Sequence, residues 1–172
     1  MPLPHDYAIQ QCSLARALEV VGERWTLLIV RDAFFGVRRF GDFAHHLRIP
    51  RAVLAQRLET LVAHGVLGPV RGSHGHEEYV LTAKGLSLWP VVRGLLVWGD
   101  THYSRSGPLR VFRHVSDDGE VGPDGTCLSC GTVISVTDLV VTPGSGLTSA
   151  GPDDEITAAL AGPHCLLDPI RA

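Results

Sequence analysis

The chain has 172 residues, of which 45% are hydrophobic and 19% charged, values typical of a folded protein and not of a disordered one. The formal net charge of −3 excludes a protein that is basic throughout, as many nucleic-acid-binding domains are. Residues 1–103 hold 11 Lys and Arg against 9 Asp and Glu, residues 104–172 hold 4 against 9, and residues 38–72 hold six arginines against two carboxylates. We therefore expect two parts, a first domain over 1–103 with a local basic surface and an acidic, Gly- and Pro-rich appendage over 104–172.

The cysteines and the N-terminal residues are those expected of a cytoplasmic protein. Four cysteines in a chain of this length do not make the disulfide framework of a small secreted domain. The first residues, Met-Pro-Leu-Pro-His-Asp, lack the basic and apolar regions of a signal peptide. The most apolar run, residues 86–99, is too short to span a bilayer and contains Pro90 and Arg93, so we expect no membrane segment.

Three short helices are expected at the start of the chain. Residues 12–21 and 24–34 predict the first two, which end at Gly22 and Gly36. Residues 40–47 predict the third, because their apolar side chains fall on one side of a helix.

The fourth helix, expected from Pro50 to His64, has two different faces. One face is predicted to be buried because apolar residues recur there at helical spacing: Leu54, Leu58, Leu61 and Val62. The opposite face carries small and polar residues flanked by arginines: Arg51, Ala52, Gln56, Arg57, Glu59 and Ala63. Small residues beside arginine and glutamine let a helix approach base edges in a major groove. Taken alone, the pattern fits an ordinary amphipathic helix with a solvated face better, because such helices are common; the neighbouring elements favour the DNA-binding interpretation.

A β-hairpin is expected after this helix. Residues 66–71 and 78–82 are β-type runs separated by a glycine-containing tip at 72–76. Short helices followed by such a hairpin form a winged helix-turn-helix, in which the helix at 50–64 enters the major groove. The predicted fold is therefore mainly α with a β-hairpin wing, plus a small β-type or irregular C-terminal appendage.

Residues 83–102 predict one further helix that is apolar around most of its circumference. A small domain cannot bury such a helix on all sides, so we expect a second copy of the chain to cover it in a two-fold dimer. The alternative is packing against the first helix of the same chain. Pro90 marks either a kink or the true start of the helix. Its apolar side chains line either a dry dimer core, which we favour, or a small-molecule pocket: Trp89, Val92, Leu96 and Trp98.

The appendage contains a candidate metal site. Its β-branched runs, residues 109–115 and 132–142, are separated by Cys127-Leu-Ser-Cys130-Gly131, a turn of the zinc-knuckle type in which both thiolates face one metal ion. One such pair supplies two ligands, and the residues that could complete the site are His114, His164 and Cys165. A last short helix is expected at 153–160.

Several segments between residues 10 and 103 carry a family pattern. In chain order they are Cys12, Gly22-Glu-Arg-Trp-Thr-Leu-Leu-Ile29, Gly36-Val-Arg-Arg-Phe-Gly-Asp-Phe43, Ile49-Pro-Arg-Ala-Val-Leu-Ala-Gln-Arg-Leu-Glu-Thr-Leu61, Gly65-Val66, Glu78-Tyr-Val-Leu-Thr-Ala-Lys-Gly-Leu-Ser-Leu88 and Trp98. This series resembles the HxlR-type winged helix transcriptional regulators. The resemblance implies a homodimeric DNA-binding regulator. No serine, cysteine or carboxylate stands in a recognisable nucleophile or acid-base pattern, so we expect no enzyme. Where the family commonly carries Lys or Arg with proline in the wing, residues 72–76 hold glycine and histidine.

The resemblance also bears on the cysteines. Family members with long tails pair a His-and-Cys element with the Cys-x-x-Cys-Gly turn, and here the upstream element is His114-Val-Ser-Asp-Asp-Gly119, with Asp in place of Cys. Zinc is the candidate metal, but we favour a turn that has lost it. Some relatives sense oxidants through a cysteine at the position of Cys12, which lies near a helix N-terminus. We favour a packing role for Cys12, and unaltered DNA binding after its complete modification would exclude the sensor.

The leading hypothesis is a dimeric regulator that binds a pseudo-palindromic operator in double-stranded DNA. Arg38 and Arg39 are expected to contact phosphates, and Arg51 and Gln56 to read guanine and adenine. Ala52 permits close approach, Arg57 is shared between phosphate contact and structure, and His74 lies in the wing. The alternatives are a winged helix used for protein interaction without specific DNA binding, and a zinc-binding module in the tail.

Overall fold

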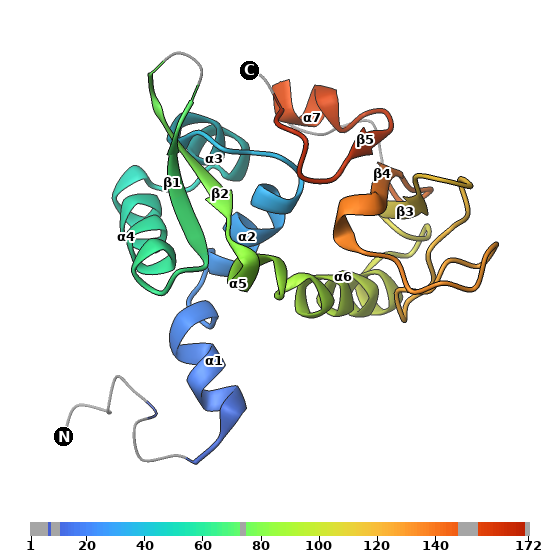
Figure 1. The fold of residues 1–172 in the computed structure, drawn as a ribbon, viewed down its shortest axis with the longest axis horizontal. Coiled ribbons are helices and arrows are strands. Elements are labelled where there is room, and N and C mark those ends of the chain that lie inside the picture. Colours follow the sequence, from blue (N-terminus) through green and yellow to red (C-terminus); the bar gives the residue numbers. More distant parts are fainter. Residues whose placement is uncertain (1–6, 8–10, 73–74, 148–154, 171–172) are drawn as a thin grey trace.

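The computed structural model describes residues 7, 11–72, 75–147 and 155–170, and Figure 1 shows their arrangement. The first part consists of α1 (Ser13–Val21), α2 (Thr26–Phe34), α3 (Phe40–Leu47), α4 (Arg51–Ala63), and the antiparallel hairpin β1 (Leu67–Arg71) and β2 (Glu77–Leu81). Then follow α5 (Ala83–Leu86) and α6 (Trp89–Tyr103). The remaining chain, which we call the tail, forms β3 (Arg110–His114), the short 3₁₀ helix η1 (Val136–Asp138), β4 (Leu139–Pro143), α7 (Glu155–Ala159) and β5 (His164–Cys165).

This order confirms the predicted mainly helical fold with a hairpin wing and a small tail that contains strands. The single helix predicted over 83–102 is wrong, because Ser87 and Leu88 separate α5 from α6. Pro90 lies in the first turn of α6, where its missing N–H has no helical partner to lose. The β-type run at 132–142 was also predicted too long, since the strand begins only at Leu139. Among the described helices, none combines the length and the apolar composition that a bilayer crossing requires.

The buried side chains of the first part and of the tail pack in one cluster. Trp89 lies between them, with ring centroids 5.0 Å from Phe34 of α2 and 5.3 Å from Phe112 of β3. The predicted division at residues 103 and 104 falls at the C-terminal end of α6. The physical core crosses that point, because apolar surface from α2, α6 and β3 is removed from water together.

Arg93 of α6 also connects the two parts. Its guanidinium lies 4.7 Å from the centroid of the Phe112 ring and donates a hydrogen bond of 3.1 Å to the carbonyl oxygen of Val121. Burial lowers the pKa of Arg93, and the carboxylates of Asp100 and Glu120 act in the opposite direction. The side chain therefore holds the tail against α6 through both its charge and its flat face.

The end of the chain docks on the turn after α2. Leu167 N–H donates to the carbonyl of Phe34 at 2.8 Å, and Ile170 N–H donates to that of Gly36 at 3.1 Å. Gly36 has a φ of +92°, and a Cβ at this position would overlap with the carbonyl oxygen of Asp168. Only glycine satisfies both requirements, the positive φ and the close backbone approach.

We expect Gly36→Ala to lower the free energy of unfolding by more than the roughly 1–2 kcal/mol that a left-handed backbone costs an L-residue, since the clash with Asp168 adds to it. Chemical denaturation would measure the change. Gly65→Ala is the matched control, because Gly65 has a φ of +66° but open space around its Cβ position. Equal losses in the two variants would contradict a close contact between the tail and Gly36.

Candidate nucleic-acid interface

Helix α4 buries the face that its sequence pattern predicts. Leu54, Leu58 and Leu61 are at most 1% exposed and pack into the core. The residues of the other face are exposed to solvent: Arg51, Ala52, Gln56, Glu59 and Ala63. In Figure 1, α4 forms one side of the molecule beside β1, while the tail lies on the opposite side of the first part. A convex helix face is therefore presented away from the acidic tail.

Arg51 and Gln56 stand on this exposed face. The guanidinium of Arg51, in the first turn of α4, lies 4.8 Å from the centroid of the Phe40 ring, which restricts its position by a cation–π contact. The hydroxyl of Thr60 donates a hydrogen bond of 2.9 Å to the backbone carbonyl oxygen of Gln56. These side chains and the small Ala52 are exposed, as contact with base edges would require, and that contact remains a prediction.

Arg57 is held by the loop between α1 and α2. It donates to Oε2 of Glu23 at 2.9 Å and to the carbonyl oxygen of Arg24 at 3.4 Å. Arg24 lies 5.4 Å above the ring of Trp25, whose φ of 80° turns the chain into α2. Arg57 therefore has the structural role that was predicted for it, since it connects α4 to the loop before α2. Its contact with phosphate remains a prediction.

The predicted phosphate-binding pair, Arg38 and Arg39, already makes contacts within the chain. Arg38 donates to the carbonyl oxygen of Leu167 at 2.9 Å, and Arg39 forms an ion pair of 3.6 Å with Glu78 of β2. Sequence reasoning missed the contact of Arg38, because Leu167 is 129 residues away along the chain. Phosphate binding by Arg38 requires its guanidinium to leave the tail, and for both residues it remains a prediction. His74 lies outside the described residues.

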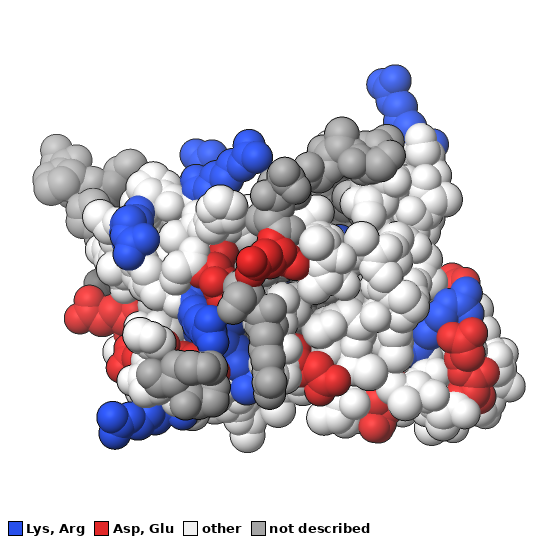
Figure 2. All heavy atoms as spheres, turned by 90° about the horizontal axis from the view of Figure 1, so that it is seen from above, with Lys and Arg blue, Asp and Glu red and all other residues white. Residues whose placement is uncertain are grey.

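Charges of both signs surround Arg39. Burial raises the pKa of Asp42 in α3, and the nearby carboxylates of Glu155 and Glu78 raise it further, while Arg39 and His45 lower it. Figure 2 shows the face seen from above, where arginine and lysine side chains form separate groups with carboxylates between them. On this face the described residues form no continuous basic field, so any attraction for phosphate comes from individual arginines.

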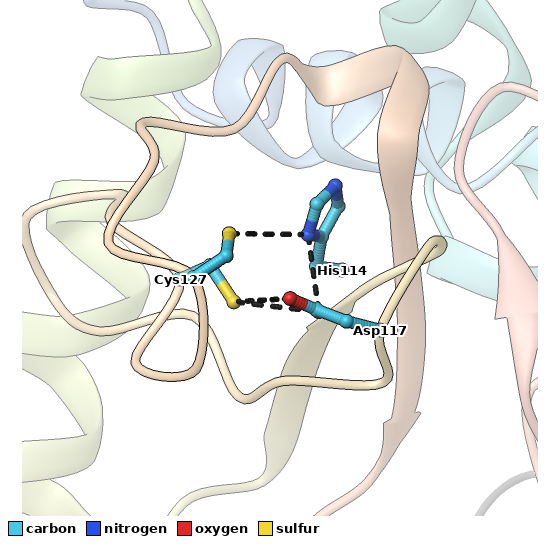
Figure 3. Close-up of side chains that lie close together, drawn as sticks. His114, Asp117 and Cys127 are labelled. Atoms are coloured by element: carbon cyan, nitrogen blue, oxygen red, sulfur yellow. Dashed lines mark hydrogen bonds and ion pairs between the residues drawn. The ribbon is translucent and has the colours of Figure 1, made fainter.

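A second group of polar side chains lies in the tail (Figure 3). The structure brings His114, Cys127 and Cys130 together, as the sequence proposed, and adds Asp117 to them. The N–H of Gly119 donates to Asp117 at 2.9 Å and is the largest cause of the lowered pKa of that carboxyl. The other two candidate ligands, His164 and Cys165, lie in β5 outside this group of described residues.

Cys12 is exposed at the N-terminal cap of α1. The packing role that the sequence favoured for this thiol is therefore wrong for the isolated chain. The exposed position is accessible to an oxidant or alkylating agent, and the sensor role remains a prediction.

The residues predicted to line a ligand pocket do not do so together. Trp89 and Val92 are 8% and 4% exposed and fill the core. An open pocket of about 490 Å³ lies instead at the C-terminal end of α6. Of the four residues predicted to line a pocket, only Leu96 lies in its wall, together with Leu95, Asp100, Tyr103 and Leu109. A small-molecule effector remains a prediction, with this pocket as its candidate position.

The comparisons with known proteins agree with this geometry. The family model for the HxlR-like helix-turn-helix matches residues 20–107. An uncharacterized HTH-type transcriptional regulator of Mycobacterium tuberculosis (strain H37Rv) is 44% identical over 137 residues, 78% of this chain and 87% of that protein. The uncharacterized HTH-type transcriptional regulator YdeP of Bacillus subtilis is 26% identical over 118 residues, 65% of this chain and 92% of that protein. The crystal structure of PA1607, a candidate transcription factor, matches this chain with a TM-score of 0.53 and a sequence identity of 35%. The match covers 84% of this chain and 92% of that one.

Proposed function

Because the chain belongs to the HxlR-like helix-turn-helix family, whose similar members are transcriptional regulators, we propose that it acts as a homodimer on a pseudo-palindromic DNA operator. The observation that carries the proposal is the exposed face of α4, with Arg51, Ala52 and Gln56 beside the hairpin wing. Such a helix enters the major groove, where arginine pairs with guanine and glutamine with adenine. The similar proteins are named regulators and not enzymes, and we propose no catalytic activity.

The outer side of α6 supports the dimer. Val91, Leu95 and Trp98 follow one another at helical spacing and are 48%, 48% and 54% exposed. Figure 1 shows α1 projecting from the rest of the molecule, and its Leu14 is 66% exposed. A second copy related by a two-fold axis would cover these apolar side chains and place two α4 helices in successive major grooves, roughly 34 Å apart.

The experiment that tests the proposal uses Arg51→Ala on an operator obtained by selection from random DNA. A bidentate contact to a base contributes about 1–3 kcal/mol, so we expect roughly 5- to 150-fold weaker binding to the operator and relaxed preference at one base pair. Arg105→Ala in the tail is the matched control, because Arg105 is exposed and far from α4 in sequence. It should leave the affinity unchanged.

Two outcomes would contradict this assignment. An equal loss on operator and random DNA would mean that Arg51 contacts phosphate and does not read a base. DNA binding that is weak and insensitive to salt would favour the alternative, a winged helix used for protein interaction, since phosphate contacts release counterions and give a steep salt dependence.

A further inference from the structure

Four metal-binding side chains converge at one end of the tail, outside the proposed DNA interface. His114 ends β3, Asp117 lies in the turn that follows, and Cys127 and Cys130 form the tight turn beyond it. One donor atom from each lies within 4.8 Å of all the others. In Figure 3 the imidazole, the carboxylate and the two sulfur atoms point toward one another.

The separations of these atoms fit a tetrahedral zinc ion. With Zn–S near 2.3 Å and Zn–N or Zn–O near 2.0–2.1 Å, a tetrahedron has N–O edges of about 3.3 Å and edges from sulfur to N or O of about 3.6 Å. His114 Nδ1 lies 3.1 Å from Asp117 Oδ1, and Cys130 Sγ lies 3.7 Å from His114 Nδ1. Cys127 Sγ lies 3.5 Å and 3.6 Å from the two carboxylate oxygens of Asp117.

The surrounding loop holds these donors in place. Gly119 N–H donates to Asp117 Oδ1 at 2.9 Å, and the hydroxyl of Ser116 lies 3.0 Å from Nε2 and 3.2 Å from Nδ1 of His114. Gly131, with a φ of +72°, closes the cysteine turn by donating to the carbonyl of Cys127 at 2.9 Å. A Cβ on Gly119 would collide with Cys127 Sγ, so the loop approaches the sulfur as closely as a glycine permits. Such partners orient the ligands of a metal before it binds.

We propose that His114, Asp117, Cys127 and Cys130 bind one zinc ion. The imidazole coordinates through Nδ1 and keeps its proton on Nε2, the carboxylate coordinates through one oxygen, and the two thiols release their protons and coordinate as thiolates. Mixed sulfur, nitrogen and oxygen donors in this geometry suit zinc better than the hard cations magnesium and calcium. Asp117 supplies the fourth donor in the element where the sequence has Asp in place of Cys.

The ion is structural. All four coordination positions are filled by protein, which leaves none open for a substrate or for catalytic water. Cys127 is fully buried and belongs to the same apolar cluster as Phe112 and Val121. Zinc would therefore fasten the loop between residues 114 and 130 onto the tail core that packs against α6. The tail strands are short, and a metal stabilises small structures of this kind effectively.

Metal content of the tag-free full chain tests the site. Protein purified without added chelator should contain one zinc ion per chain by elemental analysis, and Cys130→Ser should reduce this content at least tenfold after dialysis against a chelator. Asp117→Asn should lower the affinity for zinc by at least about tenfold, measured in competition with a chromophoric chelator. The side-chain oxygen of the asparagine can still accept the hydrogen bond from Gly119. Both positions are exposed and Cys127 is unchanged in both variants, so neither substitution by itself removes a buried side chain.

Cys12→Ser and Cys165→Ser are the matched controls, because both thiols are exposed and lie outside the cluster. Each should keep a full zinc content. Cobalt in place of zinc should give the intense visible absorption of a tetrahedral thiolate site, and Cys130→Ser should abolish it. A wild-type chain without zinc whose four thiols react freely in denaturant would overturn the proposal, as would undiminished zinc in Cys130→Ser. These measurements involve no DNA, so they test the metal site independently of the proposed regulator function.

Discussion

Replacing Trp89 by alanine is expected to lower the free energy of unfolding by about 3–5 kcal/mol, the range found for the loss of a large buried aromatic side chain. Trp89 is 8% exposed and its ring contacts Phe34 on one side and Phe112 on the other. The truncation therefore opens a cavity at the junction of α2, α6 and β3. Urea denaturation followed by circular dichroism would give the change.

A double-mutant cycle with Phe112→Ala sharpens this test. If the first part and the tail share one core, the loss in Trp89→Ala/Phe112→Ala is smaller than the sum of the two single losses, because both variants remove the same ring contact. Leu128→Ala is the control, since Leu128 is 70% exposed in the tail. Additive losses, or two separate unfolding transitions, would show that the tail and the first part are independent.

Leu95→Glu is expected to convert a dimer into a monomer and to weaken operator binding by about 100-fold or more. Leu95 lies at the centre of the exposed apolar row on α6, so a charge there would be buried without a partner in the dimer but solvated in the monomer. Two α4 helices joined in one dimer bind two half-sites with an avidity that separate monomers lack, and such linkage contributes about 10²–10⁴ in affinity. Analytical ultracentrifugation and a titration of operator DNA measure the two effects.

Val133→Glu provides the comparison for this variant. Val133 is 72% exposed in the tail, so a glutamate there adds the same charge away from α6 and should leave both the dimer and the DNA affinity intact. If Leu95→Glu stays dimeric while DNA binding is retained, the dimer interface lies elsewhere, with the exposed side of α1 as the next surface to test.

Much of the first part could be predicted from local pattern. The leucines of α4 recur every three or four residues, and this spacing alone places them on one face of a helix and Arg51 and Gln56 on the other. Glycine at position 36 follows the end of α2 and proline at position 50 precedes the start of α4, and both act by their own backbone preferences within a few residues. The proximity of Cys127 and Cys130 could also be predicted from local sequence, because their two-residue spacing is typical of a metal-binding turn.

The tertiary structure decided what these residues contact across the chain. Trp89 and Val92 were expected in a pocket or dimer core because the sequence shows only that they are apolar. Both are instead buried within the chain, with Trp89 between Phe34 of α2 and Phe112 of β3. Arg38 contacts Leu167, and Asp117 joins two cysteines ten or more residues away, where its place beside them depends on how β3 and the following loop fold back. Periodicity and turn residues determine local conformation because they act through neighbours in sequence. Which surfaces meet is determined by long-range packing. For that reason the local basic helix could be predicted from the sequence, whereas the tail contacts and the position of Asp117 beside the cysteines could not.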